Sequence, residues 1–274
     1  TQPPKKKSRG QKIIESPVHA VSKKLNLQVR YPESLRNKDE FNFIKKLAPD
    51  IVVVVAYGQI IPDLILDIIN INFINIHASL LPRWRGAAPI QRSIMEMDKE
   101  TGITIMKIVS KLDAGPIMIQ EKIKITKNMD SEKLSENLSL LGSKLIIKSL
   151  HLLKNKKGKF IEQNEKEATY AKKIKKSECQ LKWNISAKEL VAKINGLSPF
   201  PGAWFEHRNN RLKIIKAEET DLRGKIGEII NDNLTIGCLD KSIKIIKIQK
   251  AGKKILNTNE FLAGYSIKKG ENLA

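Results

Sequence analysis

The segment Ile51-Val52-Val53-Val54-Val55-Ala56 constrains the fold of this chain more than any other feature. A continuous run of apolar, mostly β-branched residues is typical of a strand that is buried on both faces of a parallel sheet. Tyr57-Gly58 ends the run, and residues 60–68 then have the pattern of a crossover helix. A strand followed at once by a helix predicts an α/β domain, because parallel strands need such crossovers.

The rest of the chain continues this alternation and then changes character. Further helices are predicted at 11–25, 33–47, 87–97 and 130–154, and further strands at 71–76, 101–108 and 117–125. We therefore expect an α/β, Rossmann-like domain with a largely parallel sheet over residues 1–155. A polar, lysine-rich stretch predicts a linker at 156–172. Beyond it, a helix at 187–195 and short strands punctuated by glycine predict a small β-barrel within 173–274.

Polar residues that could donate hydrogen bonds or relay protons lie where two predicted strands end. Asn75 and His77 close the strand at 71–76, and because they are two residues apart they project to the same side. Asp113 lies in the turn after the strand at 101–108. Neighbouring strand ends of a parallel sheet lie close together, so we expect a contact between His77 and Asp113. Ligands of open α/β sheets bind beyond this edge. An amide can donate to a developing oxyanion and a histidine can relay a proton. A lone histidine is more often structural, so these residues alone leave the reaction open.

The charge of the chain suggests a nucleic-acid partner without proving one. Its formal net charge is +21, which attracts phosphate if the lysines cluster in space. The chain is rich in Lys, Ile and Asn throughout, so part of this charge reflects composition. Cys179 and Cys238 lie far apart without metal-ligand spacing, which favours a reducing cytoplasm and no metal. No apolar run approaches the roughly 20 residues of a membrane span, and the opening lacks a secretory signal.

Two motifs carry a resemblance to a known family. The stretch Asn75-Ile76-His77-Ala78-Ser79-Leu80-Leu81-Pro82-Arg83-Trp84-Arg85-Gly86-Ala87-Ala88-Pro89-Ile90 resembles the signature loop of the folate-dependent formyltransferases. Thr101-Gly102-Ile103-Thr104-Ile105-Met106 and Leu112-Asp113-Ala114-Gly115 resemble the family's second motif. The residues of the first loop are more similar to those of the branch that acts on methionyl-tRNA than to those of the branches that act on glycinamide ribonucleotide or sugar nucleotides. The match extends to Thr1-Gln2-Pro3, Thr169-Tyr170-Ala171, Trp183 and Phe200-Pro201-Gly202-Ala203-Trp204.

The resemblance implies a reaction, a donor and a partner. A formyl group would pass from 10-formyltetrahydrofolate to the α-amino group of methionine on initiator tRNA, with no metal and no protein partner. Asn75, His77 and Asp113 would be catalytic. The formyl donor would be bound by Ser79, Leu80, Leu81 and Pro82. The basic opening would enter the acceptor stem of the tRNA through Lys5, Lys6, Lys7, Arg9 and Lys12, and the C-terminal segment would be an OB-like tRNA-binding barrel.

One departure from the family pattern keeps other readings open. The strand, helix and strand that precede Thr1-Gln2-Pro3 in the family are absent here, and the first strand of a doubly wound sheet is central. We therefore expect neighbouring strands to lack a partner. The alternatives are a truncated, inactive paralogue or RNA-binding protein, and a folate enzyme that formylates a small molecule. A small-molecule enzyme would need neither the basic opening nor the C-terminal barrel.

Overall fold

The N-terminal half of the chain is built around a four-stranded mixed sheet. The computed structural model describes residues 1–7, 12–68 and 72–273. The sheet has the order β3-β4-β6-β7, from Ile51–Val54, Asn72–His77, Glu100–Lys107 and Ile117–Lys124. Only β3 and β4 are parallel, while β6 runs antiparallel to both of its neighbours. The α/β class is as predicted, but the expectation of a largely parallel sheet is wrong for these strands, because β4 returns to the sheet as β6 in the opposite direction.

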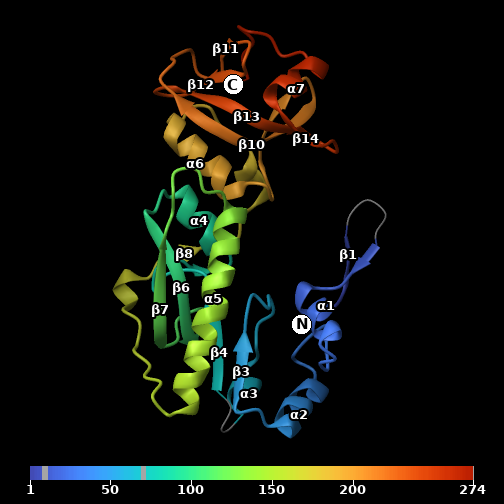
Figure 1. Cartoon of the computed structure of the whole chain (residues 1–274), viewed down its shortest axis with the longest axis vertical. Helices are drawn as coiled ribbons and strands as arrows, with labels where there is room; N and C mark the ends of the chain where they lie inside the picture. The colour runs from blue at the N-terminus through green and yellow to red at the C-terminus, as the bar shows by residue number, and fades with distance from the viewer. Residues whose placement is uncertain (8–11, 69–71, 274) are drawn as a thin grey trace.

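A long helix covers one face of this sheet. Helix α5, Ser131–Lys154, lies within its predicted bounds of 130–154. It begins after Asp130, whose side chain accepts a hydrogen bond from the backbone N–H of Lys133. Its apolar face packs on the sheet through a buried cluster around Ile74, Ile105 and Leu138 (Figure 1). Burial of these side chains removes apolar surface from water and fixes which face of each strand looks inward. The opposite face of β4 is therefore available for polar side chains.

The strand Ile51–Val54 differs from its prediction. We expected a strand buried on both faces, but 39% of Val53 is exposed and 52% of the neighbouring Val55. Among the described residues β3 pairs with β4 alone, which makes it the edge of the sheet. An edge strand has one neighbour and is covered less completely than a central one. The β-branched run correctly predicted a strand, whereas its burial depended on neighbours that a local pattern does not specify.

The elements before and after β3 are shorter than predicted. Strands β1, Lys5–Lys7, and β2, Lys12–Ile14, form an antiparallel pair, so the helix expected at 11–25 begins only at α1, Pro17–Lys24. Ser16 caps α1 by accepting from the backbone of His19. The remaining short helices are α2, Lys38–Leu47, α3, Asp63–Leu66, and α4, Pro89–Met95. Figure 1 shows β1, α1 and α2 lying to one side of β3.

The C-terminal half is a separate antiparallel sheet with its own core. The strands follow the order β11-β12-β13-β10-β9, and β14 pairs with β13. Their bounds are Ala203–His207 for β9, Asn210–Thr220 for β10, Ile229–Asn231 for β11, Thr235–Gly237 for β12, Ser242–Lys250 for β13 and Ile255–Asn257 for β14. Helix α6, Ala187–Leu197, contributes to the core of this half, and α7 spans Thr258–Gly264. The predicted helix and small β domain are thus confirmed.

A connecting arm runs from the end of α5 to α6 along the first half. It includes the short helices η1, Glu165–Glu167, and η2, Lys176–Cys179. Strand β8, Tyr170–Ala171, pairs in parallel with β5, Arg85–Gly86, inside the signature loop. The two halves also meet where Ser131 donates to the carbonyl of Ser198 at 2.7 Å. No helix in the described ranges has both the length and the apolar content to cross a bilayer.

Candidate active site

Strand β4 presents Asn75 and His77 on the face that α5 does not cover. Ile74 and Ile76 alternate with them and pack into the core beneath α5. His77 is 6% exposed, while Asn75 is half-buried. A strand places every second side chain on one face, so the apolar pair fixes the direction of the polar pair. This part of the site follows directly from the sequence pattern.

His77 is held at both ring nitrogens. Its Nε2 lies 2.9 Å from the carbonyl oxygen of Trp84, and its Nδ1 lies 3.6 Å from Oδ2 of Asp113. Because a carbonyl oxygen can only accept, Nε2 carries the proton of the neutral ring. Burial lowers the pKa of His77 below 6.5, and the charge of Asp113 and the hydrogen bond to Trp84 oppose that shift. A second proton, placed on Nδ1, would face the Asp113 carboxylate directly.

Asp113 is aimed at His77 by the backbone around it. It adopts a left-handed φ of 48°, and its Oδ2 accepts a hydrogen bond of 2.8 Å from the backbone N–H of Gly86. Gly115 allows the same turn to approach β6, since a Cβ there would lie 2.0 Å from the carbonyl oxygen of Lys107. The structure therefore brings two of the three predicted catalytic residues into contact. Asn75 contacts neither side chain by a hydrogen bond, and within the described residues its amide has no partner.

The loop after His77 is anchored by the hydroxyl of Thr104 on β6. This hydroxyl donates to the carbonyl of Ser79 at 2.7 Å and accepts from the backbone N–H of Leu81 at 3.1 Å. The amide of Gln120 on β7 donates to the Thr104 hydroxyl and to the carbonyl of Leu81, both at 2.8 Å. The loop is thus fastened to the sheet through one buried side chain that sequence reasoning did not single out.

The four residues predicted to bind the formyl donor have different environments. Ser79 is buried and donates to the carbonyl of Arg83 at 2.6 Å, and Leu81 is 3% exposed. Pro82 is half-buried, and its carbonyl accepts from the backbone of Thr169 at 3.2 Å. Leu80 is the one that lines a cavity, of about 270 Å³. The other three support the loop in the described structure.

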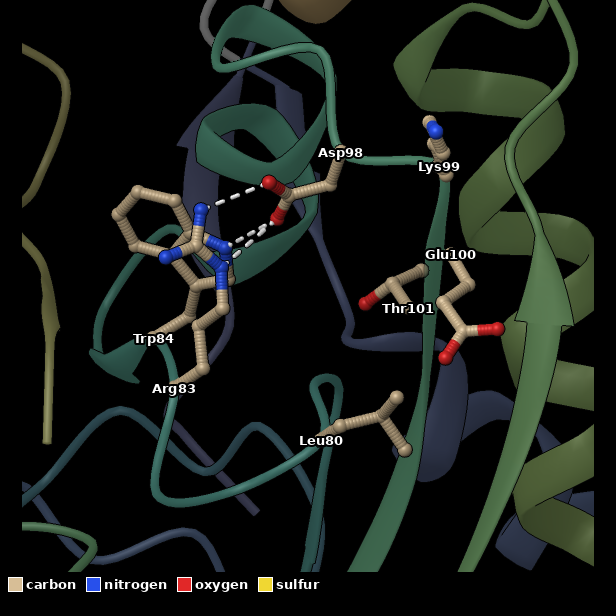
Figure 2. A pocket seen from close by; sticks show the side chains of 7 residues that line it. All are labelled: Leu80, Arg83, Trp84, Asp98, Lys99, Glu100 and Thr101. Atoms are coloured by element: carbon tan, nitrogen blue, oxygen red, sulfur yellow. Dashed lines mark hydrogen bonds and ion pairs between the residues drawn. The ribbon is translucent and has the colours of Figure 1, made fainter. Parts of the chain in front are cut away.

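This cavity lies beside the His77–Asp113 pair without including it. It is lined by Leu80, Arg83, Trp84, Asp98, Lys99, Glu100 and Thr101. Figure 2 shows Asp98 bridging Arg83 and the indole of Trp84, with Thr101 across from them on β6. The backbone of Trp84 faces His77, while its indole N–H binds Asp98 at 2.7 Å. Trp84 therefore connects the wall of the cavity to the hydrogen bond of His77.

Replacing Thr104 by valine is expected to loosen the loop that follows His77 and to destabilise the protein. The change removes the partner of two buried backbone groups, the Ser79 carbonyl and the Leu81 N–H, and each such group left unsatisfied costs about 1–3 kcal/mol. The free energy of unfolding, measured with denaturant, should therefore fall by about 2–6 kcal/mol.

Thr101→Val is the matched control. Thr101 lies on the same strand and is 3% exposed, but its hydroxyl has no partner among the described residues. Removing an unpaired buried hydroxyl should leave the stability unchanged or raise it. Equal losses in the two variants would contradict the anchoring role of Thr104.

Four of the five residues predicted to bind tRNA lie in the opening pair of strands. Lys5, Lys6 and Lys7 form β1 and Lys12 begins β2, whereas Arg9 lies outside the described residues. Lys5 donates to the side chain of Gln2 at 2.6 Å, and Gln2 in turn donates to the carbonyl of Tyr57 just after β3. The opening is thereby tied to the edge of the sheet.

Over the described ranges, no three His, Cys, Asp or Glu side chains gather in a way that could hold a metal ion. The groups available for chemistry are a buried histidine that can gain a proton, a carboxylate that would balance that charge, and an amide free to donate. Such groups suit an enzyme that moves protons and stabilises an oxyanion during group transfer.

The chain belongs to the formyl transferase family. Residues 1–150 match the model described as formyl transferase, and residues 173–266 match the formyl transferase C-terminal domain. The methionyl-tRNA formyltransferase of Pelagibacter ubique (strain HTCC1062) is 51% identical over 275 residues, covering 100% of this chain and 89% of that protein. The methionyl-tRNA formyltransferase of Brucella anthropi is 40% identical, covering 98% and 90%.

Solved structures show the same fold. A methionyl-tRNA formyltransferase from Clostridium thermocellum superposes with a TM-score of 0.54 at 23% identity, over 67% of this chain and 79% of that chain. HypX from Aquifex aeolicus, in complex with tetrahydrofolic acid, gives a TM-score of 0.64 at 17% identity, over 81% of this chain and 40% of that longer chain. The expected α/β domain followed by a small β domain is thus confirmed, with a mixed sheet in place of the largely parallel one.

Proposed function

We infer that the protein transfers a formyl group to the α-amino group of methionine esterified to initiator tRNA, giving N-formylmethionyl-tRNA. The observation that carries this conclusion is the 51% identity to a methionyl-tRNA formyltransferase over the whole chain. The contact between His77 and Asp113 supports it. Such an enzyme acts where charged tRNA is used, so we assign it to the cytoplasm.

The formyl donor we propose is 10-formyltetrahydrofolate. The family membership supports this choice, and one structural neighbour was solved with tetrahydrofolic acid. In the reaction the amine nitrogen bonds to the formyl carbon and the bond from that carbon to the folate nitrogen breaks. The amine loses a proton and the leaving nitrogen gains one. The protein therefore has to stabilise a transient oxyanion and carry a proton between two nitrogens.

We propose that Asn75, His77 and Asp113 divide these tasks. The half-buried amide of Asn75 has no partner among residues 1–7, 12–68 and 72–273 and can donate to the oxyanion. His77 is neutral at rest and can take up the amine proton at Nδ1, where the Asp113 carboxylate would stabilise the resulting cation. The leaving nitrogen then receives this proton. We retain Ser79, Leu80, Leu81 and Pro82 as the proposed donor-binding loop, with Leu80 the residue open to a ligand.

We further propose a division of labour along the chain. Residues 1–155 carry out the transfer, 173–274 bind the tRNA, and 156–172 connect them. The net charge of +21 favours binding to a polyanion. Lys5, Lys6, Lys7, Arg9 and Lys12 are proposed to contact the acceptor stem, where lysine and arginine engage phosphates.

The direct test is a formylation assay. The protein is incubated with 10-formyltetrahydrofolate and initiator tRNA charged with methionine, and the aminoacyl product is released and identified. N-formylmethionine is expected, and a preparation of His77→Gln serves to exclude a contaminating enzyme. Absence of product under conditions where the Pelagibacter ubique relative is active would contradict the inference. Formylation of free methionine at the same rate would favour the small-molecule alternative.

A further inference from the structure

The arm that follows α5 makes direct contact with the turn that carries Asp113. The Nε2 of Gln163 donates to the carbonyl of Asp113 at 2.9 Å and to the carbonyl of Gly115 at 2.8 Å. Gln163 is 9% exposed, so these hydrogen bonds are shielded from water. The two protons of its amide nitrogen therefore bind two carbonyls of the same turn, one at Asp113 and one at Gly115. That turn places the carboxylate against His77.

Gln163 is itself held by a buried guanidinium. Nε and Nη2 of Arg85 donate to Oε1 of Gln163 at 3.0 and 2.9 Å, and the side chain of Arg85 has no exposed surface. Arginine can only donate and a carbonyl can only accept, so the amide of Gln163 has one possible orientation. Glu165 completes the network by accepting from Arg85 and from Lys111. These two cations lower the pKa of Glu165 to about 2, which keeps its charge in place opposite Arg85.

The same arm fixes the hydrogen-bond partner of His77. The backbone N–H of Arg85 donates to the carbonyl of Thr169 at 2.8 Å, and the Thr169 hydroxyl accepts from the backbone of Trp84 at 2.9 Å. The peptide bond between Trp84 and Arg85 is planar. Holding its N–H therefore orients its carbonyl, which is the group that binds Nε2 of His77.

We propose that residues 163–171 support the catalytic pair, and that Gln163 and Arg85 are positioning residues which set the Asp113 carboxylate against His77. The proposal rests on the proposed formyl transfer for its effect on turnover. Its structural content is independent of that reaction: the arm holds the turn that carries Asp113 and the peptide whose carbonyl binds His77. A segment expected from its composition to be a linker thus acquires a role in the chemistry.

The test uses Gln163→Met in the whole 274-residue chain. Methionine fills similar space but neither donates to the Asp113 turn nor accepts from Arg85. The kcat for formylation should fall roughly 100-fold, the scale of a small misplacement of a catalytic group. The KM values should change by less than about twofold, because the contacts with both substrates are intact. Glu162→Met, at the exposed neighbouring position, is the control and should behave as the wild type.

Gln163→Glu separates orientation from simple packing. A carboxylate still accepts from Arg85 and so preserves the buried ion network, but it presents no donor to the carbonyls of Asp113 and Gly115. We expect this variant to fold and to lose kcat as Gln163→Met does. A rate equal to that of the wild type in Gln163→Glu would show that only the contact with Arg85 matters, and would overturn the proposal.

The ring signals of His77 give a readout that does not need activity. The chain has four histidines, so a histidine-labelled NMR spectrum is simple, and the His77 signals are those lost in His77→Gln. In Gln163→Met these signals should shift while those of the other three stay in place. Unmoved His77 signals would overturn the proposal even if kcat fell. If the wild type formylates nothing but the signals shift, the proposed function fails and the positioning role stands.

Discussion

Replacing His77 by glutamine is expected to lower kcat for formylation at least roughly 100-fold, since a positioned acid–base group contributes about 10²–10⁴ to a rate. The amide of glutamine can still donate to the Trp84 carbonyl, so the loop keeps a partner at this point. It cannot take up the proton of the attacking amine. The loss should therefore fall on turnover rather than on the fold.

His151→Gln is the control for this change. His151 is exposed on α5, far along the chain from the site, and the same substitution there should leave kcat unaltered. Thermal melting of both variants checks that the fold is intact. A His77→Gln protein that formylates at close to the wild-type rate would show that the histidine is structural, which is the ordinary role of a buried histidine held by a backbone carbonyl.

Asp113→Asn is expected to have the second largest effect on turnover, again roughly 100-fold in kcat. The asparagine oxygen can still accept from the backbone of Gly86, so the turn is preserved. What disappears is the negative charge that faces Nδ1 of His77 at 3.6 Å. A cation formed at His77 during proton transfer is then no longer balanced. Asp232→Asn, in an exposed turn, should leave kcat unchanged.

The same variant has a signature in the titration of His77. Burial lowers the pKa of His77 below 6.5, and the charge of Asp113 acts in the opposite direction. Removing that charge should therefore lower the pKa of His77 further, which NMR can follow. The unfolded chain takes up a proton near pH 6.5 and the folded protein only at lower pH. The contribution of His77 to stability is therefore present above pH 6.5 and is lost as the pH falls toward the folded value.

In Asp113→Asn this loss should extend to lower pH than in the wild type. A His77 pKa that stays the same or rises in the variant would mean that the carboxylate does not act on the ring. The formylation rate and the titration thus test the same contact by independent measurements.

Local patterns were sufficient for the strands of the N-terminal sheet, for helix α5 and for one side of the site. The alternation of Ile74 and Ile76 with Asn75 and His77 determined which face of β4 carries polar groups, because strand geometry repeats every two residues. The amphipathic pattern of residues 130–154 likewise predicted the long helix α5. These features depend on neighbours close in sequence, so they could be predicted from the sequence alone.

Tertiary structure decided what depends on distant neighbours. The β-branched run at Ile51–Val54 determined a strand, but its exposure followed from its place at the edge of the described sheet. The residues of the candidate site, Asn75, His77 and Asp113, could be named from their positions at or after strand ends. Only the folded chain showed that Gln163 and Arg85 orient Asp113, since these contacts join residues 50 and 78 positions apart, a separation at which no periodic pattern reports on proximity.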